Sequence, residues 1–228
     1  AVSNSLKEET INLFSITNTI KVIPNFIDIE KYSKVKRNPY RSKLCPKRER
    51  LLIHTSNFRK VKRIQDVINV FCKINKEIPS KLIMIGDGPE RANIESLTRS
   101  LCSLRDVMFI GKIPDVETVL YKADLFLLTS EKESFGLSAL EAMASSVPVI
   151  SSNAGGLPEL VEEGISGFTC DIGDINSMSE KAIKVLSEKN LSGFKKNAFR
   201  IANNYDINII LPKYVESVSY THLRAHET

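Results

Sequence analysis

The chain lacks the features that would place it in a membrane or outside the cell. No apolar run reaches eighteen residues, and no signal peptide opens the 228-residue sequence. A membrane-spanning helix needs about twenty predominantly apolar residues, and a secretory signal has a short apolar core after a basic start. We therefore expect no membrane span and no export, which leaves the cytoplasm as the default location.

Cysteine and histidine are also scarce. The four cysteines are scattered without a C-x-x-C pair, and two of the three histidines fall in the last seven residues. Metal sites and disulfide scaffolds need these residues at short, regular spacings, so we expect neither. Cys72 and Cys102 fall among apolar neighbours in expected helices, where they are predicted to be small core hydrophobes.

What is present is an ordinary globular composition with an uneven charge. Hydrophobic residues make up 42% and charged residues 26% of the chain, whose net charge is +5. Between residues 34 and 63, twelve basic residues accompany one acid, Glu49. Such a run can bind nucleic acid, but Tyr40 is its only aromatic residue before the first expected strand, and no nucleic-acid module is recognisable. We expect a basic linker over 35–50 and no nucleic-acid partner, whereas 59–63 has better functional prospects.

The middle of the chain alternates short apolar runs with helical periodicity, which is typical of repeated βα units and a parallel sheet. We expect strands at 51–55, 81–86, 107–110, 124–129, 147–151 and 167–171. Helices are expected at 63–77, 90–102, 116–121, 135–144, 157–162, 177–187 and 192–204. The predicted fold class is therefore α/β with a doubly wound parallel sheet.

Two carboxylates eight residues apart, Glu133 and Glu141, straddle the junction between an apolar strand and an amphipathic helix. Open α/β sheets bind ligands at the carboxyl ends of their strands, and carboxylates accept hydrogen bonds from pairs of hydroxyl groups. The spacing alone occurs often by chance. Phe135, Gly136 and Leu137 strengthen it, because a glycine where strand becomes helix lets the backbone approach a ligand and leaves free N–H groups for an anion.

A second glycine turn, Gly86-Asp-Gly, follows a strand and precedes a helix, and is a weak signal by itself. The third glycine position of a dinucleotide fingerprint is occupied by Arg91, which weakens a nicotinamide or flavin interpretation.

The segment 130–144, with Val-Pro-Val-Ile after it and Asn-Ala-Gly-Gly-Leu-Pro-Glu at 153–159, resembles the donor-binding half of the retaining glycosyltransferases of the GT-B fold, family 4. The likeness runs from about residue 1 to residue 214. It implies a Rossmann-like sheet that forms the carboxy-terminal half of a GT-B fold. Within the family it is strongest to the branch that transfers N-acetylglucosamine to L-malate at the start of bacillithiol biosynthesis.

The resemblance also implies where the cations lie. Metal-independent members place an arginine and a lysine of the first βα loop on the donor phosphates, and here Lys62 matches the lysine while Asn57 stands at the arginine position. Because asparagine carries no charge, Arg59 is the expected substitute, since its guanidinium fork can grip phosphate oxygens.

The implied roles follow the ligand from end to end. Glu141 would hold the ribose and Glu133 a sugar hydroxyl, while Lys62 and Arg59 neutralise the departing diphosphate. The remaining donor contacts are expected from Asn57, Gly86, Phe135, Gly136, Leu137, Ser138 and the main chain near Ile113. No metal, no separate cofactor and no protein nucleophile is expected.

The domain plan has four parts. Residues 1–34 are expected to end an amino-terminal acceptor domain and cross into the next one, with Phe26 where the family has a glycine. After the 35–50 linker, 51–214 would form the donor domain, and 215–228 a disordered or foreign tail. The chain does not begin with methionine, so we expect a truncated enzyme that lacks most of its acceptor domain and is inactive alone.

The expected substrates are UDP-N-acetylglucosamine and a small acceptor such as L-malate, and a homodimer is left open. Three other functions also stay open: another family 4 UDP-sugar transferase, a UDP-sugar epimerase, and a non-catalytic nucleotide-sugar-binding module.

Overall fold

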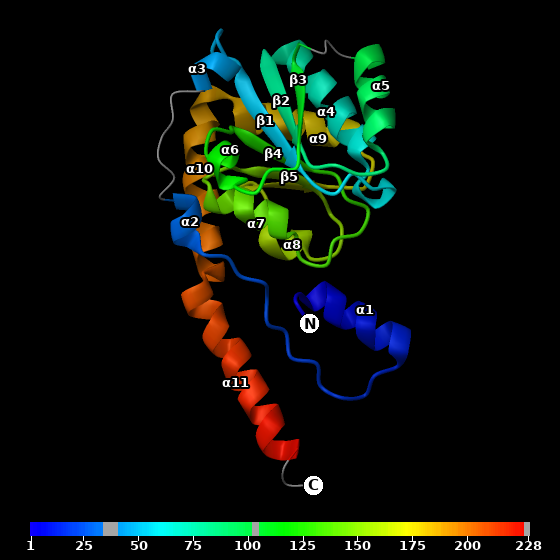
Figure 1. The fold of residues 1–228 in the computed structure, drawn as a ribbon, viewed down its shortest axis with the longest axis vertical. Helices are drawn as coiled ribbons and strands as arrows, with labels where there is room; N and C mark the ends of the chain where they lie inside the picture. The colour runs from blue at the N-terminus through cyan, green and yellow to red at the C-terminus, as the bar shows by residue number, and fades with distance from the viewer. Residues whose placement is uncertain (34–40, 102–104, 226–228) are drawn as a thin grey trace.

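Six parallel strands form the centre of the molecule, in a computed structural model that describes residues 1–33, 41–101 and 105–225. The strand order is β3-β2-β1-β4-β5-β6, so the order reverses between the neighbouring strands β1 and β4 (Figure 1). In open α/β sheets this reversal is the point at which ligands bind. The strands are β1 (Arg50–Thr55), β2 (Ser80–Ile85), β3 (Val107–Gly111), β4 (Leu125–Leu128), β5 (Val149–Ser152) and β6 (Gly167–Cys170).

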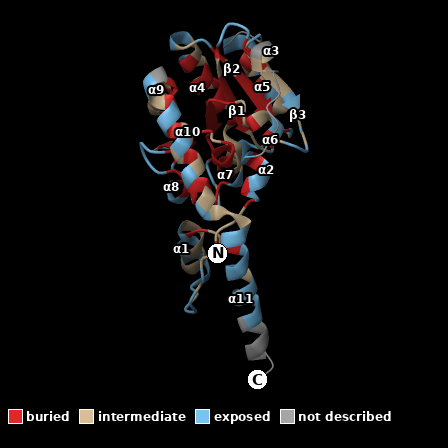
Figure 2. Ribbon diagram, turned by 90° about the vertical axis from the view of Figure 1, so that its left-hand side faces the viewer, coloured by how far each residue is buried: buried red, intermediate tan, exposed pale blue. Residues whose placement is uncertain are grey.

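Helices cover both faces of the sheet because successive strand residues point to opposite sides. Leu51 and Ile53 pack in one core cluster, and Leu52 between them packs in the other. The first cluster lies under α6 (Glu117–Leu120), α7 (Leu137–Ala144), α8 (Leu157–Leu160) and α10 (Glu188–Ala202). The second lies under α4 (Ile64–Glu77), α5 (Arg91–Leu101) and α9 (Ile175–Leu186). Buried strands and a buried α7 form the red centre of Figure 2.

Segments at both ends of the chain extend away from this body. Helix α1 (Asn4–Phe14) lies below the sheet in Figure 1, and the chain then runs back to α2 (Ile29–Ser33) beside α7. Helix α11 (Ile207–Ala225) projects in the same direction and is largely exposed (Figure 2). Within the described residues, no helix is both long and apolar enough to span a membrane.

The expected α/β class is confirmed, and the strands and helices of the sheet region lie within a few residues of their predicted bounds. Two other expectations differ. Helix α11 continues to Ala225, so residues 215–225 are helical rather than disordered, and the alternative of a foreign tail stays a prediction. Cys72 packs against the second core cluster as expected but is disulfide-bonded, which was not expected, while Cys45 and Cys170 are free and buried.

The expected 35–50 linker is only partly covered by the described residues. Residues 35–40 lie outside them, as does Cys102. From residue 41 the chain is ordered as α3 (Arg41–Leu44) and a tight turn, in which the amide of Arg48 donates to the carbonyl of Cys45 at 3.2 Å. Because Cys45 is buried, this part is anchored to the domain and does not behave as a linker.

Candidate functional site

Two loops meet at the reversal of strand order, one after β1 and one after β4. The hydroxyl of Thr129, at the end of β4, donates to the carbonyls of Lys62 and Arg63 at 3.0 and 2.9 Å. The amide of Glu131 donates to the carbonyl of Val61 at 2.7 Å. These bonds hold the β4 loop against η1 (Lys60–Lys62), the 3-10 turn that precedes α4.

This contact brings together two of the residues that the sequence singles out. The Lys62 ammonium donates to Glu133 Oε2 at 2.6 Å, and the Ser130 hydroxyl donates to the same oxygen at 3.3 Å. The side chains of Lys62 and Glu133 are 19% and 16% exposed, so the pair is shielded but still open to a ligand. An opposite charge at this distance fixes where both groups point.

Glycines of the β5–α8 loop complete the support for Glu133. The amide of Gly156 donates to the Glu133 carbonyl at 3.0 Å. A Cβ on Gly155, whose φ is +53°, would lie 1.8 Å from that same carbonyl oxygen. Only glycine therefore allows this loop to pack on the backbone of Glu133.

A pocket of about 480 Å³ opens at the Lys62–Glu133 pair. One wall comes from the loops after β4 and β5, including Ser134 and Gly155, and the other from Ser5, Leu6 and Glu9 of α1. Helix α1 is held there because the Ser3 hydroxyl donates to the Ser134 carbonyl at 2.6 Å. The lining carries lysines suited to phosphate and carboxylates suited to sugar hydroxyls.

The second carboxylate of the motif, Glu141, lies in a different environment. It sits on α7 and accepts a hydrogen bond from the Tyr32 hydroxyl of α2 at 2.9 Å. Burial raises the pKa of Glu141, although the Tyr32 hydrogen bond opposes the rise. Burial, and then the nearby Glu141 charge, raise the pKa of Tyr32 as well. Glu141 does not line the pocket at Glu133, so the structure does not place the two motif carboxylates in one cavity.

The other expected cation and the amides at the start of α7 lie at the same end of the sheet, where Arg59 and Leu137 are exposed but Gly136 is buried. Arg59 precedes η1 and is exposed, as is Asn57, and neither lines the pocket. Gly136 caps α7 with φ +97° and no side-chain hydrogen bond. Among the described residues, the amides of Gly136, Leu137 and Ser138 donate no hydrogen bond within the protein.

Three further predicted residues have packing roles in this structure. A Cβ on Gly86 would lie 1.8 Å from the Ser56 carbonyl oxygen, so this glycine lets the β2 loop pack under the β1 loop. Phe135 is buried and meets Tyr205 edge to face at 5.5 Å. Ile113 packs against the core cluster under α6 and α7.

Two residues of this region were not anticipated. One is Tyr32, the partner of Glu141. The other is His54 in β1, whose Nδ1 lies 2.8 Å from the Leu127 carbonyl and whose Nε2 lies 2.7 Å from the Ser56 hydroxyl. A carbonyl only accepts, so Nδ1 carries the proton and Nε2 accepts from Ser56. Burial lowers the pKa of His54 to about 4.

A sequence signal existed for each of them. His54 interrupts an otherwise apolar inner strand, and a polar side chain there needs hydrogen-bond partners. Ile29 and Tyr32 are three residues apart and share a buried helix face.

Comparison with known proteins agrees with this fold. A parallel sheet in the 3-2-1-4-5-6 order, with a charged pocket at its reversal, defines a Rossmann-like ligand-binding domain. The chain belongs to the glycosyl transferases group 1, whose family model matches residues 36–202. The resemblance inferred from the sequence motifs is therefore confirmed.

Two of the relatives are named for the transfer of N-acetylglucosamine. N-acetyl-alpha-D-glucosaminyl L-malate synthase of Bacillus anthracis is 43% identical over 192 residues, which cover 84% of this chain and 50% of that protein. The 2-deoxystreptamine N-acetyl-D-glucosaminyltransferase of Niallia circulans is 28% identical over 168 residues, or 70% of this chain and 43% of that protein. The chain thus spans about half the length of the curated relatives it matches.

Solved structures place the fold in the carboxy-terminal half of GT-B glycosyltransferases. Anabaena HepE, determined in complex with UDP and glucose, superposes with a TM-score of 0.86 at 25% identity, covering 96% of this chain and 62% of that one. The predicted fold class is confirmed down to the GT-B half.

Proposed function

We propose that this chain is the donor domain of a retaining glycosyltransferase that transfers N-acetylglucosamine from UDP-N-acetylglucosamine to L-malate. The observation that carries the proposal is the Lys62–Glu133 pair in a pocket at the reversal of strand order. Support for the substrates comes from the name of the Bacillus anthracis relative and from the UDP bound by Anabaena HepE.

The Lys62–Glu133 pair suits a nucleotide-sugar donor because the ammonium can bind the diphosphate and the carboxylate can bind the sugar. A diphosphate offers Lys62 a stronger anionic partner than a single carboxylate, and binding would free Glu133 to accept a hydrogen bond from a sugar hydroxyl. Arg59, exposed at the start of η1, adds a second cation for the phosphates. The unpaired amides of Gly136, Leu137 and Ser138 add donors where charge grows as the glycosidic bond breaks.

Glu141 is assigned to the ribose. Its carboxylate accepts from Tyr32 through Oε1, and two oxygens together provide about four acceptor positions. A pair of ribose hydroxyls can therefore bind to Glu141. Tyr32 would either keep its hydrogen bond to the carboxylate or lose it to the ribose. Asn57, Gly86 and the main chain near Ile113 border the same end of the sheet and are assigned to the uridine side.

An acceptor half is required as well. Apolar surface is exposed on α1 and α11, where Leu13, Phe14 and Val215 are 69%, 73% and 57% exposed. We assign this area to contact with an amino-terminal half that would carry L-malate. On this assignment the 228-residue chain binds donor but turns over little by itself.

No protein nucleophile is assigned. Glu133 is held by Lys62 and Ser130 as a hydrogen-bond acceptor. Retention would come from attack on the same face as the leaving diphosphate, whose oxygen takes the acceptor proton.

The test is a saturation-transfer NMR screen of the purified chain against UDP-N-acetylglucosamine, UDP-glucose, GDP-mannose and NADH. We expect the strongest transfer to UDP-N-acetylglucosamine, with the uridine and sugar protons both in contact. Transfer to NADH alone would overturn the proposal.

A second step tests the reaction, with the amino-terminal half of a relative supplied in trans together with L-malate. N-acetylglucosaminyl malate is the expected product. Formation of a new UDP-sugar without any acceptor would identify an epimerase instead.

A further inference from the structure

A second cavity, of about 830 Å³, lies at the amino-terminal ends of the strands, opposite the Lys62–Glu133 pocket. It opens beside Arg50 at the start of β1 and Pro79 just before β2, whereas Lys62 and Glu133 follow the ends of β1 and β4. Three arginines and one lysine line it, and no aspartate or glutamate does. Its full lining is Arg41, Cys45, Pro46, Lys47, Arg48, Arg50, Ile78, Pro79, Leu186 and Ser187.

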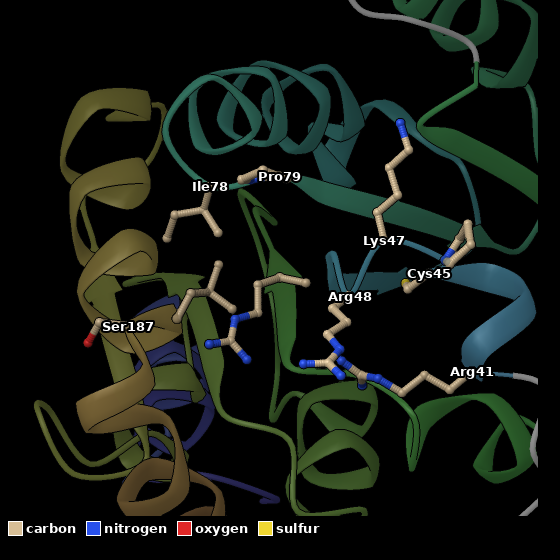
Figure 3. Close-up of a pocket in the computed structure, with 10 residues that line it drawn as sticks. Arg41, Cys45, Lys47, Arg48, Ile78, Pro79 and Ser187 are labelled. Atoms are coloured by element: carbon tan, nitrogen blue, oxygen red, sulfur yellow. The ribbon is translucent and has the colours of Figure 1, made fainter.

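Two of the three arginines approach each other. In Figure 3 the guanidinium groups of Arg41 and Arg48 lie next to each other in the cavity, while the Lys47 ammonium points away from them. Like charges repel, and a bound anion relieves the repulsion. Of these two arginines, Arg41 is also paired with Asp124. Among the described residues, no acid lies within ion-pair distance of Lys47, Arg48 or Arg50.

Two acids near the cavity are already occupied. Asp124 is buried and is bonded to Arg41, to Lys195 at 2.8 Å and to the amide of Leu51 at 3.0 Å. Burial would raise the pKa of Asp124, but Lys195 and Arg41 outweigh burial, and the pKa lies below its ordinary value. Glu49 is buried under the loop and accepts from the amide of Lys47 at 2.8 Å.

The loop that carries these cations is held in place by its backbone. Arg48 adopts φ +63°, a left-handed conformation uncommon for a residue with a side chain. Its amide bonds to the Cys45 carbonyl, and the amide of Arg50 donates to the Pro79 carbonyl at 2.9 Å. The arginines therefore start from fixed positions, which lowers the entropy lost when they bind a ligand.

We propose that this cavity binds a small phosphorylated molecule. Guanidinium groups match phosphate oxygens through paired hydrogen bonds. The cavity volume is within the range of small-molecule sites, and Ile78, Pro79 and Leu186 give it an apolar wall for the rest of such a ligand. A concave site whose cations adjoin an apolar wall favours a free molecule over a flat anionic membrane.

The test follows pyrophosphate binding by NMR, using backbone amide shifts of the whole chain in low salt. We expect saturable shifts at residues 45–50, and weaker binding as ionic strength rises. Arg48→Asn, which keeps a residue tolerant of the left-handed conformation, should weaken binding at this loop about tenfold or more. Arg50→Gln provides a second variant should Arg48→Asn fold poorly.

Two controls locate the effect. Lys196→Met removes an exposed cation elsewhere on α10 and should leave the affinity unchanged. Lys62→Met alters the pocket at the opposite end of the strands and should also leave the shifts at 45–50 intact. The test of this site is therefore independent of the test of the proposed donor site.

Three results would overturn the proposal. The first is an absence of saturable shifts at 45–50. The second is a loss of thermal stability in both arginine variants with unchanged pyrophosphate binding, because the arginines would then only offset the negative ends of α4 and α9. The third is binding to phosphatidylglycerol vesicles that depends on Arg48 without binding of pyrophosphate, which would make the surface a membrane contact.

Discussion

Glu141 and Tyr32 form a buried contact that the free protein keeps at a cost. The carboxylate is removed from water, and a single neutral hydroxyl is the partner that the structure gives it. Burial therefore dominates, and the pKa of Glu141 lies above its ordinary value. Because Glu141 is also assigned to a ligand, its burial links the stability of the protein to ligand binding.

Replacing Glu141 by Gln should raise the melting temperature at neutral pH and weaken UDP binding. Between its unfolded and its raised native pKa, Glu141 binds more protons in the native state, so its contribution to stability falls as pH rises. The uncharged amide removes this loss and still offers an oxygen to Tyr32. Thermal scans from pH 4 to 8 with UDP calorimetry check both parts; a variant that binds UDP as well as the parent would remove Glu141 from the site.

The lowered pKa of His54 predicts that stability depends on pH in the opposite direction. Its native pKa of about 4 lies below its unfolded value of 6.5, so the unfolded state binds the extra proton between these values. Stability should therefore fall as pH drops from 6.5 to 4, by on the order of 3 kcal/mol from this group. His54→Gln should flatten that part of the curve in urea titrations, and an unchanged slope would show that another group is responsible.

At this scale the sequence predicts Lys62 and Glu133 as site residues because each follows a strand of the sheet. It does not predict Tyr32 as the partner of Glu141. Lys62 and Glu133 follow the ends of two strands, so the parallel sheet brings them to the same edge. Tyr32 is 109 residues from Glu141, and the approach of α2 to α7 depends on tertiary packing that no local pattern encodes.

At the scale of elements, glycines decide how closely the loops of the site stack. Gly86 lets the β2 loop reach the β1 loop, and Gly155 lets the β5 loop reach the β4 loop. Each glycine replaces a side chain that would collide with a backbone carbonyl. The loops therefore behave as one layer that fixes the position of Glu133.

Gly155→Ala should disturb this layer. The added Cβ meets the Glu133 carbonyl and the φ of +53° disfavours alanine, so we expect a stability loss of more than about 1 kcal/mol and weaker donor binding. Gly193→Ala is the matched control, since its Cβ has nothing within 4 Å and alanine suits a helix interior. The control should gain about 0.5–1 kcal/mol. Equal effects of the two changes in urea titrations would contradict the packing argument.

Most elements of the sheet could be predicted because their apolar patterns are strong and their turns carry glycine or proline. The ends were harder. Helix α11 bears Pro212 and has no single strongly buried face, so its sequence does not show the regular pattern of a core helix. The turn after α3 is formed by a buried cysteine and a left-handed arginine, in a stretch whose composition suggests only solvated charge.

At the scale of the whole molecule, the Lys62–Glu133 pocket depends on the amino-terminal helix α1. Its walls include α1, and Glu159 fixes that helix by accepting from the amides of Asn4 and Ser5 at 2.9 and 2.7 Å. One wall of the pocket is thus formed by α1, so under the proposed function a change in the position of this helix should alter donor binding.

Donor binding is expected to need no divalent metal, since lysine, arginine and amide groups are assigned to the diphosphate. EDTA should leave the affinity for UDP-N-acetylglucosamine unchanged within error, and added Mg²⁺ should not restore or increase it. Loss of binding in EDTA, recovered by Mg²⁺, would show that the assignment of the phosphate contacts is wrong.

The central claim is that Lys62 holds the diphosphate of a nucleotide sugar, and calorimetry of Lys62→Met with UDP and with uridine tests it most directly. Lys60→Met, an exposed lysine on the same short helix, serves as the control. The account predicts at least a tenfold loss for UDP and less than a twofold loss for uridine, with neither loss in the control. Equal losses for UDP and uridine, or no loss for either, would contradict it.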